Sequence, residues 1–414
     1  MLPIFKNPMR LICRSHLLLT TALISLAPLP FGAGMAQAQM YLDNGSPGGA
    51  GYQTTNGNWR SDSQIWNDGS PGGVALPVDQ VGILTAASPS TAIELTVGGP
   101  GSGNENVWAG GLQLDSGFYT LRSGHLRSGD QGGGVNTSLS FLVNTGGSLT
   151  IHTDVTATAN INILAAASGA GTLVFSPTLG SGGNTAGTIN NAGSVLHAGE
   201  HTGNVVNDNY FAFTGQIDGD LTNVAGGTGL LANVINVAGN LTGTLTNHSY
   251  VSTSNDGGSL GGLTNHYGAT VTVVDESTLE VSTAVTNGGM LNLYGGRLIA
   301  DVNNALNGTV SMNAGTTLDS GAVLEGNLVN GGHLQGIGTI TGNLTNNSSA
   351  LFGGAVDGAL TNTGSLQTNS ALNVGSLSNA GTVTVSSTNT LTSATSVNNT
   401  ATLNINGTLD ALQP

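Results

Sequence analysis

The sequence predicts an all-β protein: a parallel β-solenoid (β-helix) of about 19 residues per coil with an irregular N-terminal cap. Three observations predict this fold: a recurring aliphatic-x-Asn motif, alternation of apolar and polar residues between its copies, and an unusual composition. The 414 residues include 66 glycines, and only 7% of the residues are charged. Such a composition disfavours helical domains, while the regular return of Leu, Val and Ile argues against a disordered chain.

The repeat motif consists of an aliphatic residue, one spacer and an asparagine. Its asparagines lie 16 to 26 residues apart, with a mean of (399 − 191)/11, or about 19. An earlier copy stands at Leu142/Asn144. The asparagines expected to form a structural ladder are Asn191, Asn207, Asn223, Asn247, Asn265, Asn287, Asn304, Asn330, Asn346, Asn362, Asn379 and Asn399.

The residues between the asparagines predict short strands with one buried face. Apolar residues alternate with polar ones, as in 372–374 and 382–385, which is the period of a half-buried strand. Five copies continue as Asn-x-Gly, a step that favours a turn because glycine and asparagine tolerate positive φ. One unit cannot bury its own apolar face, whereas stacked units can, with equivalent asparagines bonded from coil to coil.

The N-terminus predicts export. Lys6, Arg10 and Arg14 precede an apolar stretch, and Ala36-Gln37-Ala38 provides small residues at a cleavage site. Residues 1–38 are therefore expected to be a signal peptide, not a membrane anchor. Residues 39–100, which include Trp59 and Trp66, are expected to form the cap and irregular first coils, and residues 101–414 the solenoid repeats.

Charge and cysteine content exclude several functions. After removal of the signal peptide, four arginines remain against 22 acidic residues, a net charge of 4 − 22 = −18. Nucleic-acid binding needs clustered cations, so no nucleic acid partner is expected. The one cysteine, Cys13, lies in the signal peptide, so disulfide bonds cannot stabilise this fold in an oxidising compartment.

Two motifs resemble enzyme signatures but lack the required context. His197-Ala198-Gly199-Glu200-His201 matches the H-x-x-E-H pattern of some zinc peptidases, which needs a helix. Strand and turn are expected here, with the two histidines roughly 13 Å apart. Gly257-Gly258-Ser259-Leu260-Gly261 spells G-x-S-x-G, but a nucleophile elbow needs a helix after it, so a turn or loop is expected.

Several acidic residues are compatible with an alternative function, that of a β-helix enzyme that cleaves polysaccharides. Asp208, the pair Asp218/Asp220 and the pair Asp275/Glu276 are the best candidates for catalytic carboxylates or a calcium site. They are few and dispersed, and aromatic residues that could grip sugar make up 4% of the chain. We therefore expect a non-enzymatic protein without catalytic residues, cofactor or bound metal.

The chain resembles the passenger region of bacterial autotransporters, the type V secreted surface proteins. Asn58-Trp59 through Ile65-Trp66, followed by 77–79, is similar to the Trp-rich opening of such passengers, and 147–149 and 169–173 are similar to their Gly-x-Leu strand repeats. The resemblance covers most of residues 39–410 and rests on repeat style. It implies a right-handed β-helix at the cell surface with a role in adhesion, aggregation or biofilm formation.

One departure from that family concerns the C-terminus. Autotransporters end in a membrane β-barrel of amphipathic strands, whereas here the repeats run to Asp410 and no aromatic residue follows Phe352. The expectation is a translocator barrel supplied in trans or missing from this chain, with a truncated remnant as a further alternative. Partner-secreted adhesins use the first route, but their Asn-Pro-Asn signature is absent.

The sequence therefore predicts an adhesin-like structural shaft, exported through the inner membrane. Its place is the cell surface or the medium, or the periplasm if it has no translocator. Its ligand would be a host surface, a glycan or a second copy of the chain. The longer inserts around 227–240 and 311–326 are the expected contact loops.

Overall fold

The computed structural model is all-β and, in the part of the chain it describes, contains no helix. All of these residues belong to one compact unit, Gln37–Pro414. The described residues begin at Met40, so the signal peptide predicted for 1–38 lies outside them. No helix in the described part is long and apolar enough to cross a membrane. The described residues are 40–42, 57–59, 66–67, 81–85, 92–97, 106–128, 138–144, 146–164, 171–176, 184–225, 233–313 and 321–411.

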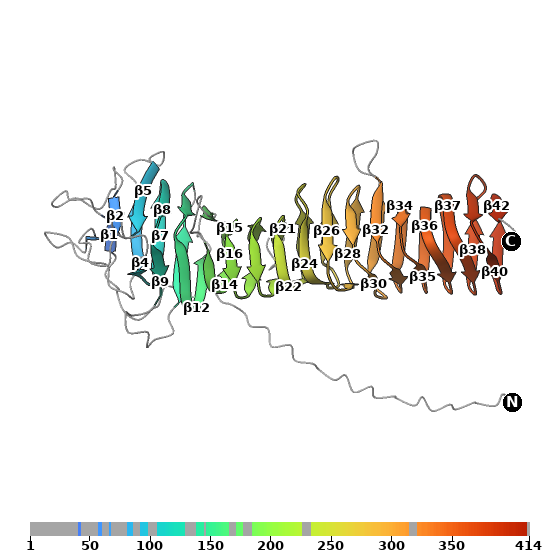
Figure 1. Ribbon diagram of the computed structural model, residues 1–414, viewed down its shortest axis with the longest axis horizontal. Coiled ribbons are helices and arrows are strands. Elements are labelled where there is room, and N and C mark those ends of the chain that lie inside the picture. The colour runs from blue at the N-terminus through green and yellow to red at the C-terminus, as the bar shows by residue number, and fades with distance from the viewer. Residues whose placement is uncertain are drawn as a thin grey trace, which may run out of the picture. The chain divides into compact units, whose positions relative to one another are not determined.

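The strands belong to one sheet that winds into stacked coils with three faces (Figure 1). On each face, a strand pairs in parallel with the equivalent strand of the next coil, as in the series Leu221↔Leu245 and Leu245↔Leu263. The one antiparallel pairing among the described strands joins β1 to β3 (Trp66–Asn67). These pairings confirm the predicted parallel β-solenoid, and its right-handed sense stays a prediction.

Three series of strands form the three faces, and the longer strands bend at the corners to serve two or all three of them. The first face comprises β1 (Met40–Leu42), β4 (Val81–Thr85), β7 (Gly111–Ser116), β10 (Leu139–Val143), β12 (Asp154–Leu164), β14 (Thr185–Asn191), β17 (Val205–Asn207), β20 (Leu221–Asn223), β22 (Asn240–Asn247), β24 (Gly258–Asn265), β27 (Val285–Asn287), β30 (Val302–Asn304), β33 (Leu328–Asn330), β35 (Leu344–Asn346), β36 (Ser349–Asn362), β37 (Ser365–Asn379) and β40 (Val397–Asn399).

The second and third faces share several of those long strands. The second face adds β2 (Gly57–Trp59), β5 (Ala92–Val97), β8 (Phe118–Arg122), β11 (Ser148–Ile151), β13 (Thr172–Phe175), β15 (Ser194–His197), β18 (Tyr210–Phe213), β21 (Val234–Val237), β23 (Tyr250–Thr253), β25 (Thr270–Val273), β28 (Met290–Tyr294), β31 (Thr309–Asn313), β34 (His333–Ile340), β38 (Thr382–Val385) and β41 (Thr402–Ile405). The third face adds β6 (Asn106–Trp108), β9 (His125–Arg127), β16 (Glu200–Thr202), β19 (Gln216–Asp218), β26 (Thr278–Val281), β29 (Arg297–Ile299), β32 (Ala322–Glu325), β39 (Thr390–Ser393) and β42 (Thr408–Ala411).

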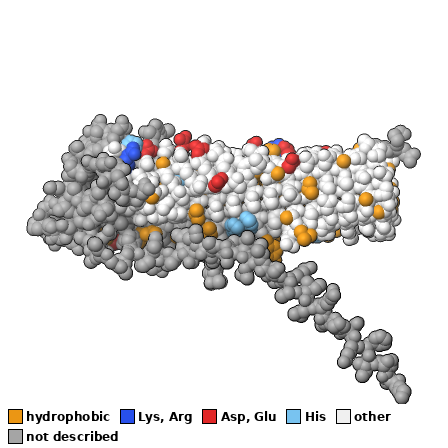
Figure 2. Space-filling model, turned by 90° about the horizontal axis from the view of Figure 1, so that it is seen from below, with side chains coloured by type: hydrophobic (Ala, Val, Ile, Leu, Met, Phe, Trp, Pro, Cys, Tyr) orange, Lys and Arg blue, Asp and Glu red, His pale blue; other side chains and the backbone are white. Residues whose placement is uncertain are grey.

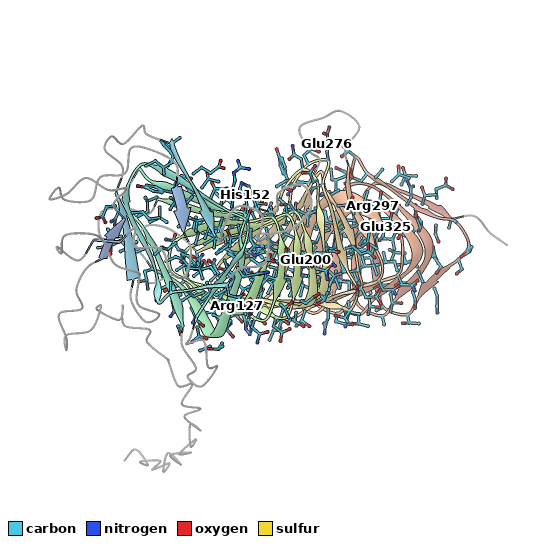
Figure 3. All side chains as sticks on the ribbon, turned by 60° about the vertical axis from the view of Figure 1, so that its left-hand side comes forward. Arg127, His152, Glu200, Glu276, Arg297 and Glu325 are labelled. Atoms are coloured by element: carbon cyan, nitrogen blue, oxygen red, sulfur yellow. The ribbon has the colours of Figure 1, made fainter. Side chains whose placement is uncertain are left out.

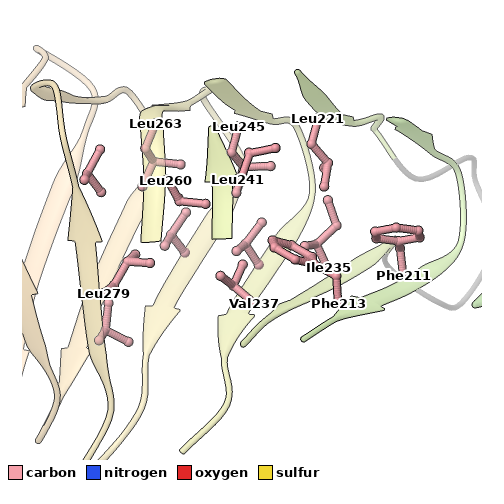
Figure 4. Close-up of a cluster of buried hydrophobic side chains, with 14 of the residues drawn as sticks. Phe211, Phe213, Leu221, Ile235, Val237, Leu241, Leu245, Leu260, Leu263 and Leu279 are labelled. Carbon is pink, nitrogen blue, oxygen red and sulfur yellow. The ribbon is translucent and has the colours of Figure 1, made fainter. Parts of the chain in front are cut away.

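A single apolar core runs along the inside of the coils. In β38, for example, Val383 and Val385 are fully buried while Thr382 and Thr384, which alternate with them, face outward. Figure 4 shows part of this core, where Leu221, Leu245 and Leu263 of the first face lie opposite side chains of the other faces. Each coil therefore buries its apolar residues against its neighbours, as the alternating pattern predicts.

Few of the residues from 39 to 100 are described, but the strands among them continue the same pairing. Met40 lies in register with Gly82, which lies in register with Leu112 of the first regular coil. The parallel sheet therefore extends into the segment expected to form the cap.

Glycines at the corners allow coils to approach closely, and Gly336 is an example. Its φ is +113°, and a Cβ at this position would collide with the backbone carbonyl of Met312 in the coil below. We expect Gly336→Ala to lower the free energy of unfolding by about 2–4 kcal/mol. Gly321→Ala is the matched control, because a Cβ at Gly321 would meet no atom within 4 Å. Equal urea midpoints for the two variants would contradict the close packing of the coils.

Candidate functional site

The ladder asparagines lie one above another where the first face turns into the second. The side-chain Nδ2 of each donates to the Oδ1 of the next, through eleven hydrogen bonds of 2.7 to 2.9 Å from Asn191 to Asn399. The structure therefore brings all twelve predicted residues together in one continuous row.

The same amides also bond to the backbone of this corner. Asn287 is typical: its Nδ2 also donates to the carbonyl of Thr309 in the next coil at 2.9 Å and to that of Gly289 in its own turn at 3.2 Å. Except for the exposed Asn399, each ladder side chain is at most 2% exposed. Buried amides need such partners, and the ladder side chains in turn provide hydrogen-bond donors to backbone carbonyls at this corner.

The earlier copy of the motif, Leu142/Asn144, is not part of this row. The position equivalent to Asn191 is held by Ile163 in the preceding coil and by Phe141 in the coil before that. Asn144 instead donates to Asp115 at 3.0 Å. Leu142/Asn144 matches the motif by residue type but stands three positions out of register with the ladder.

A second row of polar side chains, missed from the sequence, lies where the third face turns into the first. Asp301 accepts from the backbone N–H of Asn327 at 2.8 Å, Asn327 accepts from Asn343 at 2.9 Å, and Asn343 accepts from Ala359 at 2.8 Å. The sequence does carry a signal, because an Asn or Asp directly precedes the aliphatic-x-Asn motif in several copies.

Most of the acidic candidates for catalysis have structural partners. Asp220 accepts from the N–H of Thr244 at 2.8 Å, Asp218 from the amide of Gln216 at 2.7 Å, and Asp208 from that of Asn233 at 3.0 Å. Asp220 thus belongs to the second row of backbone-bonding side chains. The bonds of Asp220 and Asp208 therefore link neighbouring coils at corners, whereas the bond of Asp218 lies within β19.

The H-x-x-E-H segment forms a strand, a corner and a strand. His197 ends β15 and His201 lies in β16, and the corner between them turns both side chains into the core. Their ring centroids are 5.9 Å apart, so the expected separation of roughly 13 Å was wrong. It assumed one straight strand. Glu200 lies between them in the sequence, and its side chain is exposed.

One threonine bonds to both buried imidazoles. Thr185 Oγ1 lies 2.9 Å from His197 Nε2 and 2.7 Å from His201 Nδ1, and a hydroxyl can donate to one neutral ring while it accepts from the other. Phe175 and Phe211 pack against His197, with ring centroids 5.4 and 6.4 Å away. Burial, together with the neighbouring His201, lowers the pKa of His197 to about 3, and burial also lowers the pKa of His201.

The G-x-S-x-G segment also differs from its expectation. Gly257 ends a turn, but residues from Gly258 onward belong to β24, where a turn or loop was expected. Ser259 donates to Asn240 Oδ1 at 2.6 Å and pairs in register with the strands on either side. The corner glycines that the sequence suggested for a loop instead let the strand bend between two faces.

Charged side chains are segregated by face. Between residues 184 and 411, the described strand segments that pair on the first and second faces carry no Asp, Glu, Lys or Arg. Asp357 of β36 lies where the third face turns into the first, and Asp208 follows a ladder asparagine where the first face turns into the second. Arg297 and Glu325, for example, form an ion pair of 2.6 Å on the third face (Figure 3). The charged residues of the third face and its two corners are Glu200, Asp218, Asp220, Asp256, Asp275, Glu276, Glu280, Arg297, Asp301, Glu325, Asp357 and Asp410.

The corner at the asparagine ladder carries the most exposed apolar side chains. Tyr267 is 80% exposed and Leu306 is 78% exposed, and both follow ladder asparagines. His248 and His266 project from the same corner in adjacent coils, and their rings stack at 4.0 Å with an interplanar angle of 13°. In Figure 2, most of the visible acidic side chains lie along one edge, and one group of histidine atoms stands away from that edge among uncharged atoms.

The expected contact loops are only partly described. Within 227–240, residues 233–240 contribute β21 and the start of β22. Within 311–326, residues 311–313 and 321–326 belong to β31 and β32 and their flanks. The remainder of each insert lies outside the described residues.

Comparisons with known proteins give no relative from which a function could be transferred. No protein-family model, no curated protein and no solved structure matches the chain.

Proposed function

We propose that this protein is an exported, non-catalytic, adhesin-like shaft that makes surface contacts through its first and second faces. The observation that supports the proposal is the segregation of charge. The chain has a net charge of −15, yet between residues 184 and 411 the described strand segments that pair on two adjoining faces carry no charged side chain. Like charges repel at an interface, so contact with an acidic cell surface or a second copy is least opposed on these faces.

The shape of these faces suits repeated, extended contact. Equivalent side chains recur once per coil, for example Thr222, Thr246 and Thr264, which lie in register on the first face. Parallel strands lie ~4.8 Å apart, so the surface offers a regular row of hydroxyl groups. Affinity would come from many weak contacts along the shaft.

The test adds the same charge to different faces. Thr222→Glu combined with Thr264→Glu places two carboxylates on the first face, while Thr202→Glu combined with Thr392→Glu places two on the third face. We expect the first pair to lower binding of the purified protein to cell surfaces by about tenfold and the second pair to leave it unchanged. Settling of bacteria that display the protein gives a second measurement.

Two results would contradict the proposal. One is equal loss of binding, or no loss, in both charge variants. The other is saturable cleavage of a glycan that is lost in the Asp218→Asn/Asp220→Asn double variant, which would favour the glycan-acting enzyme. Circular dichroism of each variant checks that the β-sheet content is retained.

A further inference from the structure

His248 and His266 form a pair of imidazoles on the surface of adjacent coils. Each directly follows a ladder asparagine, Asn247 or Asn265, and these two asparagines are joined by a hydrogen bond of 2.8 Å. The backbone N–H of His266 donates to the carbonyl of Asn247 at 2.9 Å. The ladder therefore fixes the spacing of the two side chains before any ligand binds.

We propose that His248 and His266 bind a transition-metal ion of the imidazole-preferring class, such as Zn²⁺, Ni²⁺ or Cu²⁺. Neutral imidazole is a favoured ligand of these ions. Two nitrogens in a tetrahedral zinc site lie ~3.4 Å apart, given Zn–N distances of about 2.0–2.1 Å. The stacked rings are 4.0 Å apart, so a rotation about χ2 in each exposed side chain directs one nitrogen from each ring to a shared ion.

The site leaves coordination positions open. Among the residues that the structure describes, no group of three or more His, Cys, Asp and Glu side chains is placed to hold a metal ion. In the proposed site, water or the same pair from a second copy completes the coordination sphere. The strand segments beside His248 and His266 on the first and second faces are uncharged, and the nearest charged residue in the described part of this corner is Asp208, in an earlier coil.

The chain provides matched controls for this site. His333 is a partly exposed histidine whose ring contact is a hydroxyl, with Nδ1 2.8 Å from Ser349 Oγ. His125 lies 3.5 Å from Asp154 and represents a mixed pair of possible ligands. Neither residue has a second imidazole stacked on it among the described rings.

The experiment titrates the untagged protein, without its signal peptide, with ZnCl₂ and separately with NiCl₂, followed by calorimetry. Wild type, His333→Ala and His125→Ala should bind with equal affinity, and His248→Ala, His266→Ala and His266→Gln should each weaken binding by at least about tenfold. One ion per chain or one per two chains supports the proposal, and light scattering distinguishes the two. No saturable binding, or full affinity in the His266 variants, overturns it. The outcome does not depend on the adhesin-like function proposed above.

Discussion

Replacing Asn287 with alanine is expected to lower the free energy of unfolding by about 2–4 kcal/mol. The change removes the acceptor for Asn265 Nδ2, at 2.7 Å, and the donor to Asn304 Oδ1, at 2.7 Å. It also leaves the carbonyl of Thr309 without this donor. A buried group that loses its partner costs its full desolvation free energy, so the loss exceeds that of one average hydrogen bond.

Asn303→Ala is the matched control, because Asn303 lies in β30 beside the ladder but faces solvent. It should change stability by no more than about 0.5 kcal/mol. Asn287→Asp adds a second comparison: aspartate still accepts from Asn265 but cannot donate to Asn304, and it buries a charge. Urea denaturation measures all three variants. A midpoint for Asn287→Ala equal to that of Asn303→Ala would show that the ladder does not stabilise the coils.

Acidification is expected to destabilise the coils around His197 and His201. The folded-state pKa of His197 is lowered from 6.5 to about 3, and that of His201 is also lowered, because both rings are buried. The unfolded chain therefore takes up protons first, so stability is fully present above pH 6.5 and falls as the pH drops towards 3. For His197 alone the loss is of the order of 3–5 kcal/mol.

The control for acidification removes both imidazoles and keeps the packing. His197 lies in register with Phe175 and Phe213, and His201 with Ile217, so His197→Phe with His201→Leu fits the same rows. Thr185→Val is added because the hydroxyl would lose both partners. The triple variant should lose much less stability than wild type between pH 7 and 4, as measured by urea midpoints. Parallel curves for both proteins would exclude the histidines as the cause.

The fold could be predicted from the sequence because one motif marks both where each coil turns and which residues of successive coils are in register. An asparagine with an aliphatic residue two positions earlier is visible in each copy, even where the spacing varies from 16 to 26 residues. The Leu142/Asn144 copy shows the limit of this approach. The motif is recognised by residue type alone. In the two coils before Asn191, the positions in register with the ladder are occupied by Ile163 and Phe141 instead of asparagine.

The contacts between histidines and the distribution of charge could not be predicted from the motif alone. The approach of His197 to His201 depends on a corner between two strands, and the stacking of His248 on His266 depends on a pairing of residues 18 positions apart. The segregation of charge likewise requires each residue to be assigned to a face. These are properties of strand pairing, which the sequence suggests only once the register of every coil is known.

The asparagine ladder has a direction as well as a position. From Asn191 to Asn379, each side-chain amide donates an N–H to the following coil, and from Asn207 to Asn399 each side-chain oxygen accepts from the preceding coil. Turning a single amide around would place two donors together on one side and two acceptors on the other, so no rung can reverse alone. The aligned dipoles also polarise one another. The interior of the shaft therefore has a built-in polarity, and the orientation of its amides is an all-or-none property of the whole row.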